Sequence, residues 1–130
     1  FLEGGEVDVA IGLPAGVVGK THDNLIAAAA GEEHEWQHMY PDFAKVARAE
    51  GFEEIAKTME SIAVAEKFHG ERYRKLAANI QKGIVFKRED PQTLWRCRNC
   101  GYIHVGLEAP DICPACAHPK AHFELAPVNF

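Results

Sequence analysis

The sequence predicts a long antiparallel helix hairpin followed by a small domain with short strands, in a chain of 130 residues. Apolar residues spaced three or four apart over residues 21–50 and 53–81 predict the two helices. Beyond residue 84 the pattern changes to short strands and turns, and four cysteines fall within one 20-residue stretch. We therefore divide the chain into a connection (1–20), a helical hairpin (21–83) and a cysteine-containing domain (84–130).

The charge balance and the hydropathy pattern exclude two classes of partner. The net charge is -5, with 14 basic and 19 acidic residues, whereas a nucleic-acid surface needs a basic face. No apolar run approaches the roughly 20 residues that a membrane helix requires. No segment resembles a signal peptide. We therefore expect neither a nucleic-acid partner nor a membrane.

Residues 1–20 are expected to form an extended connection, because five glycines and one proline interrupt their short apolar pieces. A structureless connection of this length is unusual and needs a reason. The chain also begins at Phe1, without a methionine. This start indicates a processed or truncated product.

A first helix is expected to begin near Thr21 or Asp23, either of which could cap it, and to end before Gly51. Glu32 occupies a position where the apolar spacing predicts an apolar residue. Pro41 lies inside this helix, where it is expected to remove one backbone hydrogen bond and kink the axis. The apolar residues that define the seam are Leu25, Ala29, Trp36, Met39, Phe43 and Val46.

A second helix is expected from about Glu53 to Gln81, with Gly83 following it. Glu66 and His69 interrupt its apolar seam at two consecutive positions. At about 1.5 Å per residue each helix is roughly 40 Å long, and a short turn between two such helices predicts an antiparallel hairpin. The apolar members of this seam are Ile55, Met59, Ile62, Tyr73, Leu76 and Ile80.

The cysteines form two C-x-x-C pairs in the pattern C-x2-C-x12-C-x2-C, made by Cys97, Cys100, Cys113 and Cys116. Two opposed pairs of this kind offer four thiolates to one metal in tetrahedral geometry, and the spacing is compatible with either iron or zinc. The alternative is a ribbon with a disulfide or free thiols. Because no cysteine is left over for a structural disulfide, this usage predicts a reducing, cytoplasmic environment.

The ionisable residues in the seams predict a second site. A carboxylate on a buried helix face is costly unless it is paired or bound to metal. Glu35 follows Glu32 by three residues on nearly the same face, and Glu66-x-x-His69 has the spacing that brings a carboxylate and an imidazole to one metal. The alternative is an internal salt bridge, for instance between Glu32 and His69.

Two stretches of this sequence resemble one known family. CRNCGY followed by CPACAHPKAHFEL is similar to the rubredoxin-like module that ends rubrerythrins, and AAAAGEEHEWQHMYPDFAKVARAEGFEEIAKTMESIAVAEKFH is similar to the third and fourth helices of the rubrerythrin bundle. The resemblance implies half of a ferritin-like four-helix bundle followed by a rubredoxin-like domain. It also implies that Trp95, Tyr102 and Phe123 pack around the cysteine site. Ala117 departs from free-standing rubredoxins, in which a glycine usually follows the second cysteine pair.

The same resemblance implies an activity and its residues. The family reduces hydrogen peroxide to water at a non-haem di-iron site, with electrons relayed singly by an Fe(Cys)4 centre and supplied by a reduced nicotinamide through separate redox proteins. The resemblance implies a hydrogen bond from Tyr40 to a ligand carboxylate, the alternative being a plain core tyrosine. Matched by position, the catalytic metal ligands of the third and fourth helices are Glu32, Glu35, Glu66 and His69.

A di-iron site in a bundle takes carboxylates from four helices, and this chain offers two. The rest would come from a missing N-terminal half, from another chain, or from a second copy in a homo-oligomer. FLEGG resembles the end of the family's second helix, so residues 1–20 would be the crossover to the third. Two alternative functions are an electron carrier that uses only the Fe(Cys)4 site, and an interaction module built on a zinc ribbon.

The remaining histidines are not assigned to either site. His34 and His38 fall off the seam of Glu32 and are expected to be solvated or to lie behind the ligands. His104, His118 and His122 lie near the cysteine site, where no ligand position is left for them.

Overall fold

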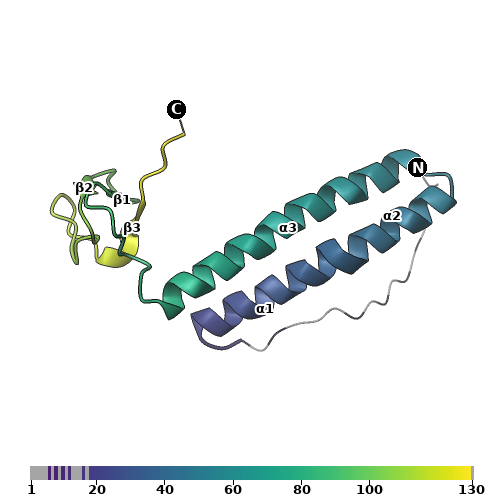
Figure 1. The fold of residues 1–130 in the computed structure, drawn as a ribbon, viewed down its shortest axis with the longest axis horizontal. Helices are drawn as coiled ribbons and strands as arrows, with labels where there is room; N and C mark the ends of the chain where they lie inside the picture. Colours follow the sequence, from purple (N-terminus) through teal and green to yellow (C-terminus); the bar gives the residue numbers. More distant parts are fainter. Residues whose placement is uncertain are drawn as a thin grey trace. The chain divides into compact units, whose positions relative to one another are not determined.

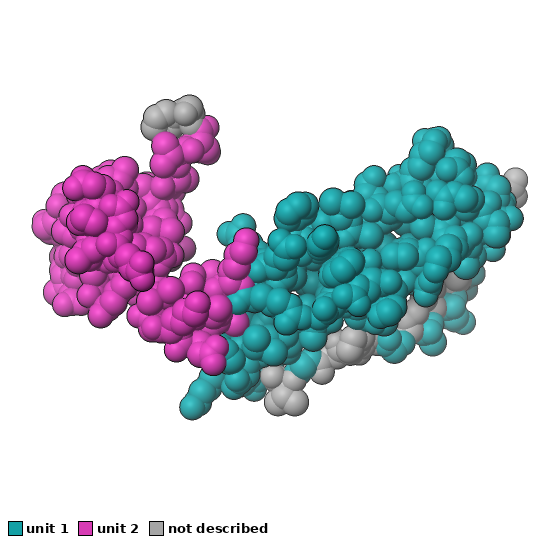
Figure 2. Space-filling model, viewed as in Figure 1, with its two compact units in different colours: residues 1–74 teal, residues 75–130 magenta. Residues whose placement is uncertain are grey.

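The fold was analysed in a computed structural model, which describes residues 6, 8, 10, 12, 16 and 18–129. The chain comprises two compact units, residues 1–74 and residues 75–130, shown separately coloured in Figure 2. The boundary between these units falls inside the long helix α3 (Glu53–Gln81). The domain boundary between residues 83 and 84, expected from the sequence, stays a prediction. Most of the predicted connection (1–20) lies outside the described residues. No helix among the described residues is both long enough and apolar enough to cross a lipid bilayer.

The first predicted helix is present as three consecutive segments, α1 (Thr21–His34), the π-helical turn η1 (Glu35–Met39) and α2 (Tyr40–Ala49). Neither Thr21 nor Asp23 caps it with its side chain. Instead the amide side chain of Asn24 bridges back to Gly19, accepting from its N–H at 2.7 Å and donating to its carbonyl at 3.1 Å. These two bonds fix the chain where it enters the helix.

The π-helical turn explains how Pro41 is accommodated. In a regular α-helix the proline ring meets the carbonyl four residues earlier. Here the N–H of Tyr40 instead donates to the carbonyl of Glu35, five residues back, and Pro41 falls in the first turn of α2. The extra residue in the turn moves the backbone out of the way of the proline ring. The disturbance thus falls directly after Glu35.

Helix α3 (Glu53–Gln81) runs antiparallel to α1 and α2, as Figure 1 shows. Three ion pairs between the antiparallel helices define how they are aligned along their length. They are Glu33 with Arg74, Glu32 with His69, and Arg48 with Glu60. The buried residues of the helices are small: Ala29, Ala44, Ala47, Ala56, Gly70 and Ala77. Small side chains let the helices approach closely, while larger apolar residues such as Phe43 and Val46 stay about half exposed, at 49% and 56%.

Both helices end at the predicted glycines. Gly51 has a φ of 86°, and Gly83 has a φ of 65°, the left-handed conformation that glycine adopts without strain. In each case the next N–H reaches back five residues, from Phe52 to the carbonyl of Ala47 and from Ile84 to that of Asn79. These are Schellman motifs, which satisfy carbonyls that the helix end leaves free.

The second unit contains a three-stranded antiparallel sheet in the order β2-β1-β3. Its strands are β1 (Leu94–Cys97), β2 (Ile103–Val105) and β3 (Phe123–Leu125), the last preceded by the short 3-10 helix η2 (Lys120–His122). The core of this unit consists of Trp95, Cys97, Ala109, Cys113 and Phe123, with Tyr102 packed against it. The three aromatic residues expected around the cysteine site therefore do pack there.

Candidate metal sites

The four cysteines converge on one point in the second unit. The Sγ atoms of Cys97 and Cys116 lie 3.7 Å apart, and those of Cys100 and Cys113 are also 3.7 Å apart. A disulfide needs about 2.05 Å between its sulfurs, so neither pair is bonded. A tetrahedral metal with bonds of about 2.3 Å to sulfur separates its ligands by about 3.8 Å. The observed spacing fits four thiolates around a single ion.

Two nearly identical backbone turns hold these sulfurs. In the first, the N–H of Gly101 donates to the carbonyl of Cys97 at 2.9 Å. In the second, the N–H of Ala117 donates to the carbonyl of Cys113 at 2.8 Å. Gly101 and Ala117 both adopt positive φ values, 82° and 58°. Ala117, which stands where free-standing rubredoxins usually have glycine, thus adopts the same left-handed backbone conformation as Gly101 in the first turn.

Backbone amides also donate to the sulfur of the second cysteine in each C-x-x-C pair, Cys100 and Cys116. The amide of Tyr102 lowers the pKa of the Cys100 thiol, but desolvation and the neighbouring sulfurs outweigh it and raise that pKa to about 12. The amide of His118 and hydrogen bonds from neighbouring groups lower the pKa of the Cys116 thiol to about 6, against an opposing desolvation. Thiols that share one site compete for the negative charge, and a bound cation would stabilise the thiolate at every position.

Three of the ionisable seam residues meet in the first unit. Glu32, Glu66 and His69 each offer a ligand atom, and these atoms lie within 4.8 Å of one another. The Nδ1 atom of His69 lies 2.6 Å from Oε2 of Glu66 and 3.7 Å from Oε2 of Glu32. The carboxylate side chains are mostly buried, at 17% and 15% exposure, whereas His69 is 56% exposed. The cluster joins α1 to α3, so it exists only in the folded hairpin.

The electrostatics of this cluster favour a cation. Burial raises the pKa of Glu32, with further contributions from the charges of Glu66 and Glu35, while His69 lowers it. A metal-ligating imidazole is neutral, so His69 in that role leaves the two carboxylates with two negative charges for a divalent ion to neutralise. The alternative from the sequence, a simple salt bridge between Glu32 and His69, matches their separation of 3.7 Å.

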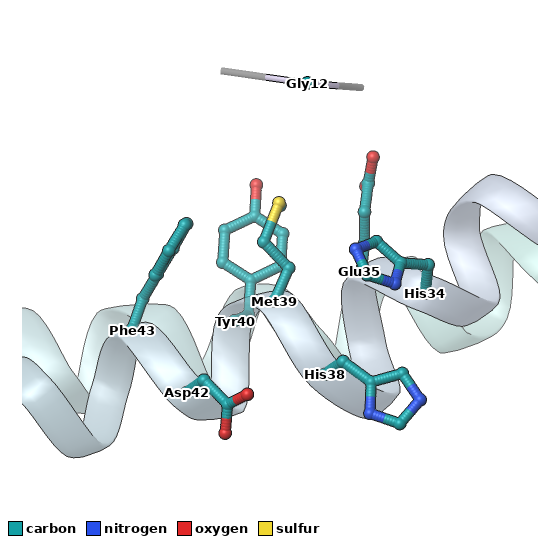
Figure 3. Close-up of a pocket in the computed structure, with 8 residues that line it drawn as sticks. All are labelled: Gly12, His34, Glu35, His38, Met39, Tyr40, Asp42 and Phe43. Atoms are coloured by element: carbon teal, nitrogen blue, oxygen red, sulfur yellow. The ribbon is translucent and has the colours of Figure 1, made fainter. Parts of the chain in front are cut away.

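Glu35 and Tyr40 lie beside the cluster without joining it. Both line a neighbouring pocket with Met39 and Phe43, and in Figure 3 these four side chains project from the same side of the helix. Burial raises the pKa of the Tyr40 phenol, and so do the charges of Glu66, Glu35 and Glu32. No hydrogen bond from Tyr40 occurs among the described residues, so its bond to a ligand carboxylate stays a prediction.

Sequence reasoning missed Gly70, which adjoins the cluster. A Cβ atom at Gly70 would lie 3.3 Å from Cβ of Glu32 and 3.7 Å from the carbonyl oxygen of Ala29. Gly70 is buried and follows His69 directly. An isolated glycine within a helical pattern is the signal that could have drawn attention to this close approach.

Two family models and several known proteins match this chain. The family model described as "Rubrerythrin" matches residues 13–77, and the one described as "Rubrerythrin, rubredoxin-like domain" matches residues 95–124. The chain is 59% identical over 130 residues to rubrerythrin of Nitratidesulfovibrio vulgaris, covering all of this chain and 68% of that protein. It is 48% identical over 130 residues to rubrerythrin of Porphyromonas gingivalis, covering 64% of that protein. A solved structure of fully reduced nigerythrin is 33% identical, with a TM-score of 0.48, over 86% of this chain and 52% of that one.

The matched models and the cysteine geometry define an iron-binding redox protein with a ferritin-like helical part and a rubredoxin-like part. The chain belongs to the rubrerythrin family. It spans about two thirds of the length of the two relatives named above. The four cysteines form the Fe(Cys)4 site of the rubredoxin-like domain.

Proposed function

We propose that this chain contributes to a peroxidase of rubrerythrin type, which reduces hydrogen peroxide to water with two electrons and two protons. The observation that carries the proposal is the presence of two different metal-ligand clusters in one chain, the tetrathiolate site and the Glu32–Glu66–His69 cluster. Carboxylate ligation suits an iron pair that accepts peroxide at open positions, and a closed tetrathiolate suits single-electron transfer. The relay between them belongs to the proposal.

The chain's own residues would serve this reaction as ligands and as electrostatic supports. Glu32, Glu66 and His69 already face one another across the hairpin, and Glu35 lies near enough for its charge to act on Glu32. In the proposal Glu35 turns to the ions as a fourth ligand. Tyr40, whose phenol is influenced by three carboxylates, would hold one of them by donating a hydrogen bond.

The helical cluster needs ligands from outside the described hairpin. Two irons in such a bundle take carboxylates from four helices, and α1 and α3 supply two of these. We propose that a further pair of helices, from a missing N-terminal segment, another chain or a second copy in a homo-oligomer, covers the half-exposed apolar residues Phe43, Val46 and Phe68. A separate redox protein in the cytoplasm would supply the electrons.

A second candidate function is a plain electron carrier. The four cysteines supply a full tetrahedral set of ligands, whereas the carboxylate cluster brings three ligand atoms together among the described residues. This difference favours electron transfer by the chain alone. Zinc is a possible substitute in the tetrathiolate site, and a colourless, redox-inactive protein containing zinc would indicate an interaction module instead.

The experiment that tests the proposal is iron reconstitution without oxygen, followed by metal analysis, the visible spectrum and peroxide consumption with a chemical reductant. Iron at about one per chain would indicate the cysteine site alone, and about three would indicate both centres. Reversible reduction of the visible chromophore with no peroxide consumption, at about three irons per chain, would reject the peroxidase and support the carrier.

A further inference from the structure

Two exposed histidines form a pair that neither metal cluster uses. His34 is the last residue of α1, and His38 lies in the π-helical turn η1. Their ring centroids are 5.8 Å apart, with an angle of 44° between the ring planes. Both side chains are exposed, and among the described residues neither imidazole has a hydrogen-bond partner. Their nitrogen atoms are therefore available to a ligand.

We propose that His34 and His38 form a surface chelate for a divalent transition-metal ion of the zinc, nickel or copper class. Neutral imidazole is a ligand that suits these ions, and two imidazoles from one helix bind as a chelate. Water would fill the remaining positions of the ion. The inference stands independently of the proposed peroxidase activity, because it concerns different side chains.

The ring separation is close to what chelation needs. With metal–nitrogen bonds of about 2.0–2.1 Å, two imidazoles on adjacent positions of one ion have centroids roughly 5 Å apart. The observed 5.8 Å exceeds this by less than about 1 Å, and exposed histidine side chains can close that gap by small rotations. Residues four apart along a helix lie on the same face, which favours the pairing of His34 with His38.

A carboxylate beside the pair adds to its attraction for a cation. Asp42 lines the same pocket as His34 and His38, and in Figure 3 its side chain projects to the same side of the helix as that of His38. The Nζ atom of Lys45 lies 2.8 Å from Oδ1 of Asp42 and occupies part of its bonding capacity. Asp42 would therefore assist the ion through its charge rather than replace either imidazole.

The proposed chelate is separate from the sites already described. The ligand atoms that converge in the helical unit belong to Glu32, Glu66 and His69, and those of His34 and His38 are not among them. The other neighbouring histidine pair, His118 and His122, is half-buried. There Nδ1 of His118 already lies 3.0 Å from the carbonyl oxygen of Cys116. Of the two histidine pairs in the described part of the chain, the one at the π-helical turn offers two open imidazoles.

Calorimetric titration with Ni²⁺ tests the inference on the full chain, with its cysteine site first filled with iron. We expect the chain to bind one more Ni²⁺ than the His34→Ala/His38→Ala double variant does. Each single variant should raise the dissociation constant by at least about tenfold, because it removes the chelate. His104→Ala, in the second unit, is the matched control and should change nothing.

Two results would overturn the inference. One is an unchanged number of bound Ni²⁺ ions and unchanged affinity in the double variant. The other is loss of the Ni²⁺ site only in His69→Ala, which would place the ion at the carboxylate cluster. As an independent readout, paramagnetic Ni²⁺ should broaden the ring-proton NMR signals of His34 and His38 before those of His69.

Discussion

The Nδ1 atom of His69 lies 3.7 Å from Oε2 of Glu32, across the space between two antiparallel helices. The same nitrogen lies 2.6 Å from Oε2 of Glu66 on its own helix. The imidazole is thus directed at both carboxylates through one atom. A metal ion held by all three side chains would lie close to this nitrogen. Because the residues are 37 positions apart, from 32 to 69, the cluster reports directly on correct packing of the hairpin.

Replacing Glu66 by alanine should remove iron from the helical site and leave the tetrathiolate site filled. One carboxylate and one imidazole are too few to hold the ions in a half-buried position. We expect iron to fall to about one per chain, with the visible spectrum of the iron–sulfur site unchanged. Metal analysis after anaerobic reconstitution measures this result.

Glu71→Ala is the matched control for the Glu66 variant, since Glu71 is an exposed glutamate on the same helix. It should retain the iron content of the unmodified chain. Equal iron content in Glu66→Ala and the unmodified chain would contradict the assignment of Glu66 as a ligand.

The ionisable cluster was predictable from the sequence because polar residues interrupted regular apolar seams at Glu32, Glu66 and His69. The helix ends were predictable for a similar local reason, since glycines stood where a left-handed residue was needed. The spacing also placed Glu35 beside Glu32. The π-helical turn begins at Glu35 and its side chain is not among the three that converge, so its role as a ligand stays a prediction.

Features that depend on local backbone geometry or on the contact between two helices could not be read from spacing. The π-helical turn arises from the conflict between Pro41 and a carbonyl of the preceding turn, and the sequence indicated only a kink. The close approach at Gly70 depends on the register of two helices. The positive φ of Ala117 depends on the second cysteine turn copying the first, although alanine itself disfavours that conformation.

The two helical glycines Gly31 and Gly70 should respond differently to alanine. Alanine stabilises a helix by about 1 kcal/mol relative to glycine. A Cβ atom at Gly31 meets nothing within 4 Å, so Gly31→Ala should gain that full amount. At Gly70 the new Cβ lies 3.3 Å from Cβ of Glu32, so strain between the helices should cancel much of the gain. Urea unfolding followed by far-ultraviolet circular dichroism gives both values.

Iron binding separates the two glycine variants further. Gly70→Ala should displace Glu32 relative to His69 and weaken iron binding at the helical site, whereas Gly31→Ala should leave it unchanged. Equal stabilisation of the two variants, with equal iron binding, would show that the helices do not pack closely at Gly70.

The two cysteine turns offer a pair of opposite substitutions. Gly101→Ala should destabilise the iron-loaded site by about 1 kcal/mol, because it places a Cβ atom at a φ of 82°. Nothing lies within 4 Å of that Cβ, so the cost comes from the backbone alone. Ala117→Gly should relieve similar strain at 58° and stabilise the site by up to about 1 kcal/mol. The denaturant midpoint of the visible iron–sulfur absorption measures both changes.

Ala115→Gly serves as the control for the second turn, because Ala117 is the only non-glycine residue with positive φ in the described part of the chain. A glycine at position 115 should destabilise slightly, through the added freedom of the unfolded chain. A stabilisation by Ala115→Gly equal to that of Ala117→Gly would refute backbone strain as the cause.

Lys120 should give the second unit a stability that depends on pH. Its Nζ atom lies 2.7 Å from Oε1 of Glu108 and 2.7 Å from Oδ1 of Asp111. The hydrogen bond from Lys120 lowers the pKa of Glu108, with a smaller contribution from Lys87. A carboxylate with a lowered pKa adds stability above its unfolded value of 4.5, and this stability is lost as pH falls through the lowered pKa.

The variant Lys120→Met tests this coupling, because methionine keeps the length of the apolar stem and removes the charge. The iron-loaded variant should be less stable than the unmodified chain at pH 7, and the difference should shrink as pH falls well below 4.5. High salt should also reduce the difference, since the carboxylates that pair with Lys120 remain partly exposed to solvent. Lys87→Met, whose Nζ lies 3.3 Å from Glu108, should show a smaller effect of the same sign. A stability difference for Lys120→Met that persisted unchanged at low pH would instead assign the role of Lys120 to packing of its stem.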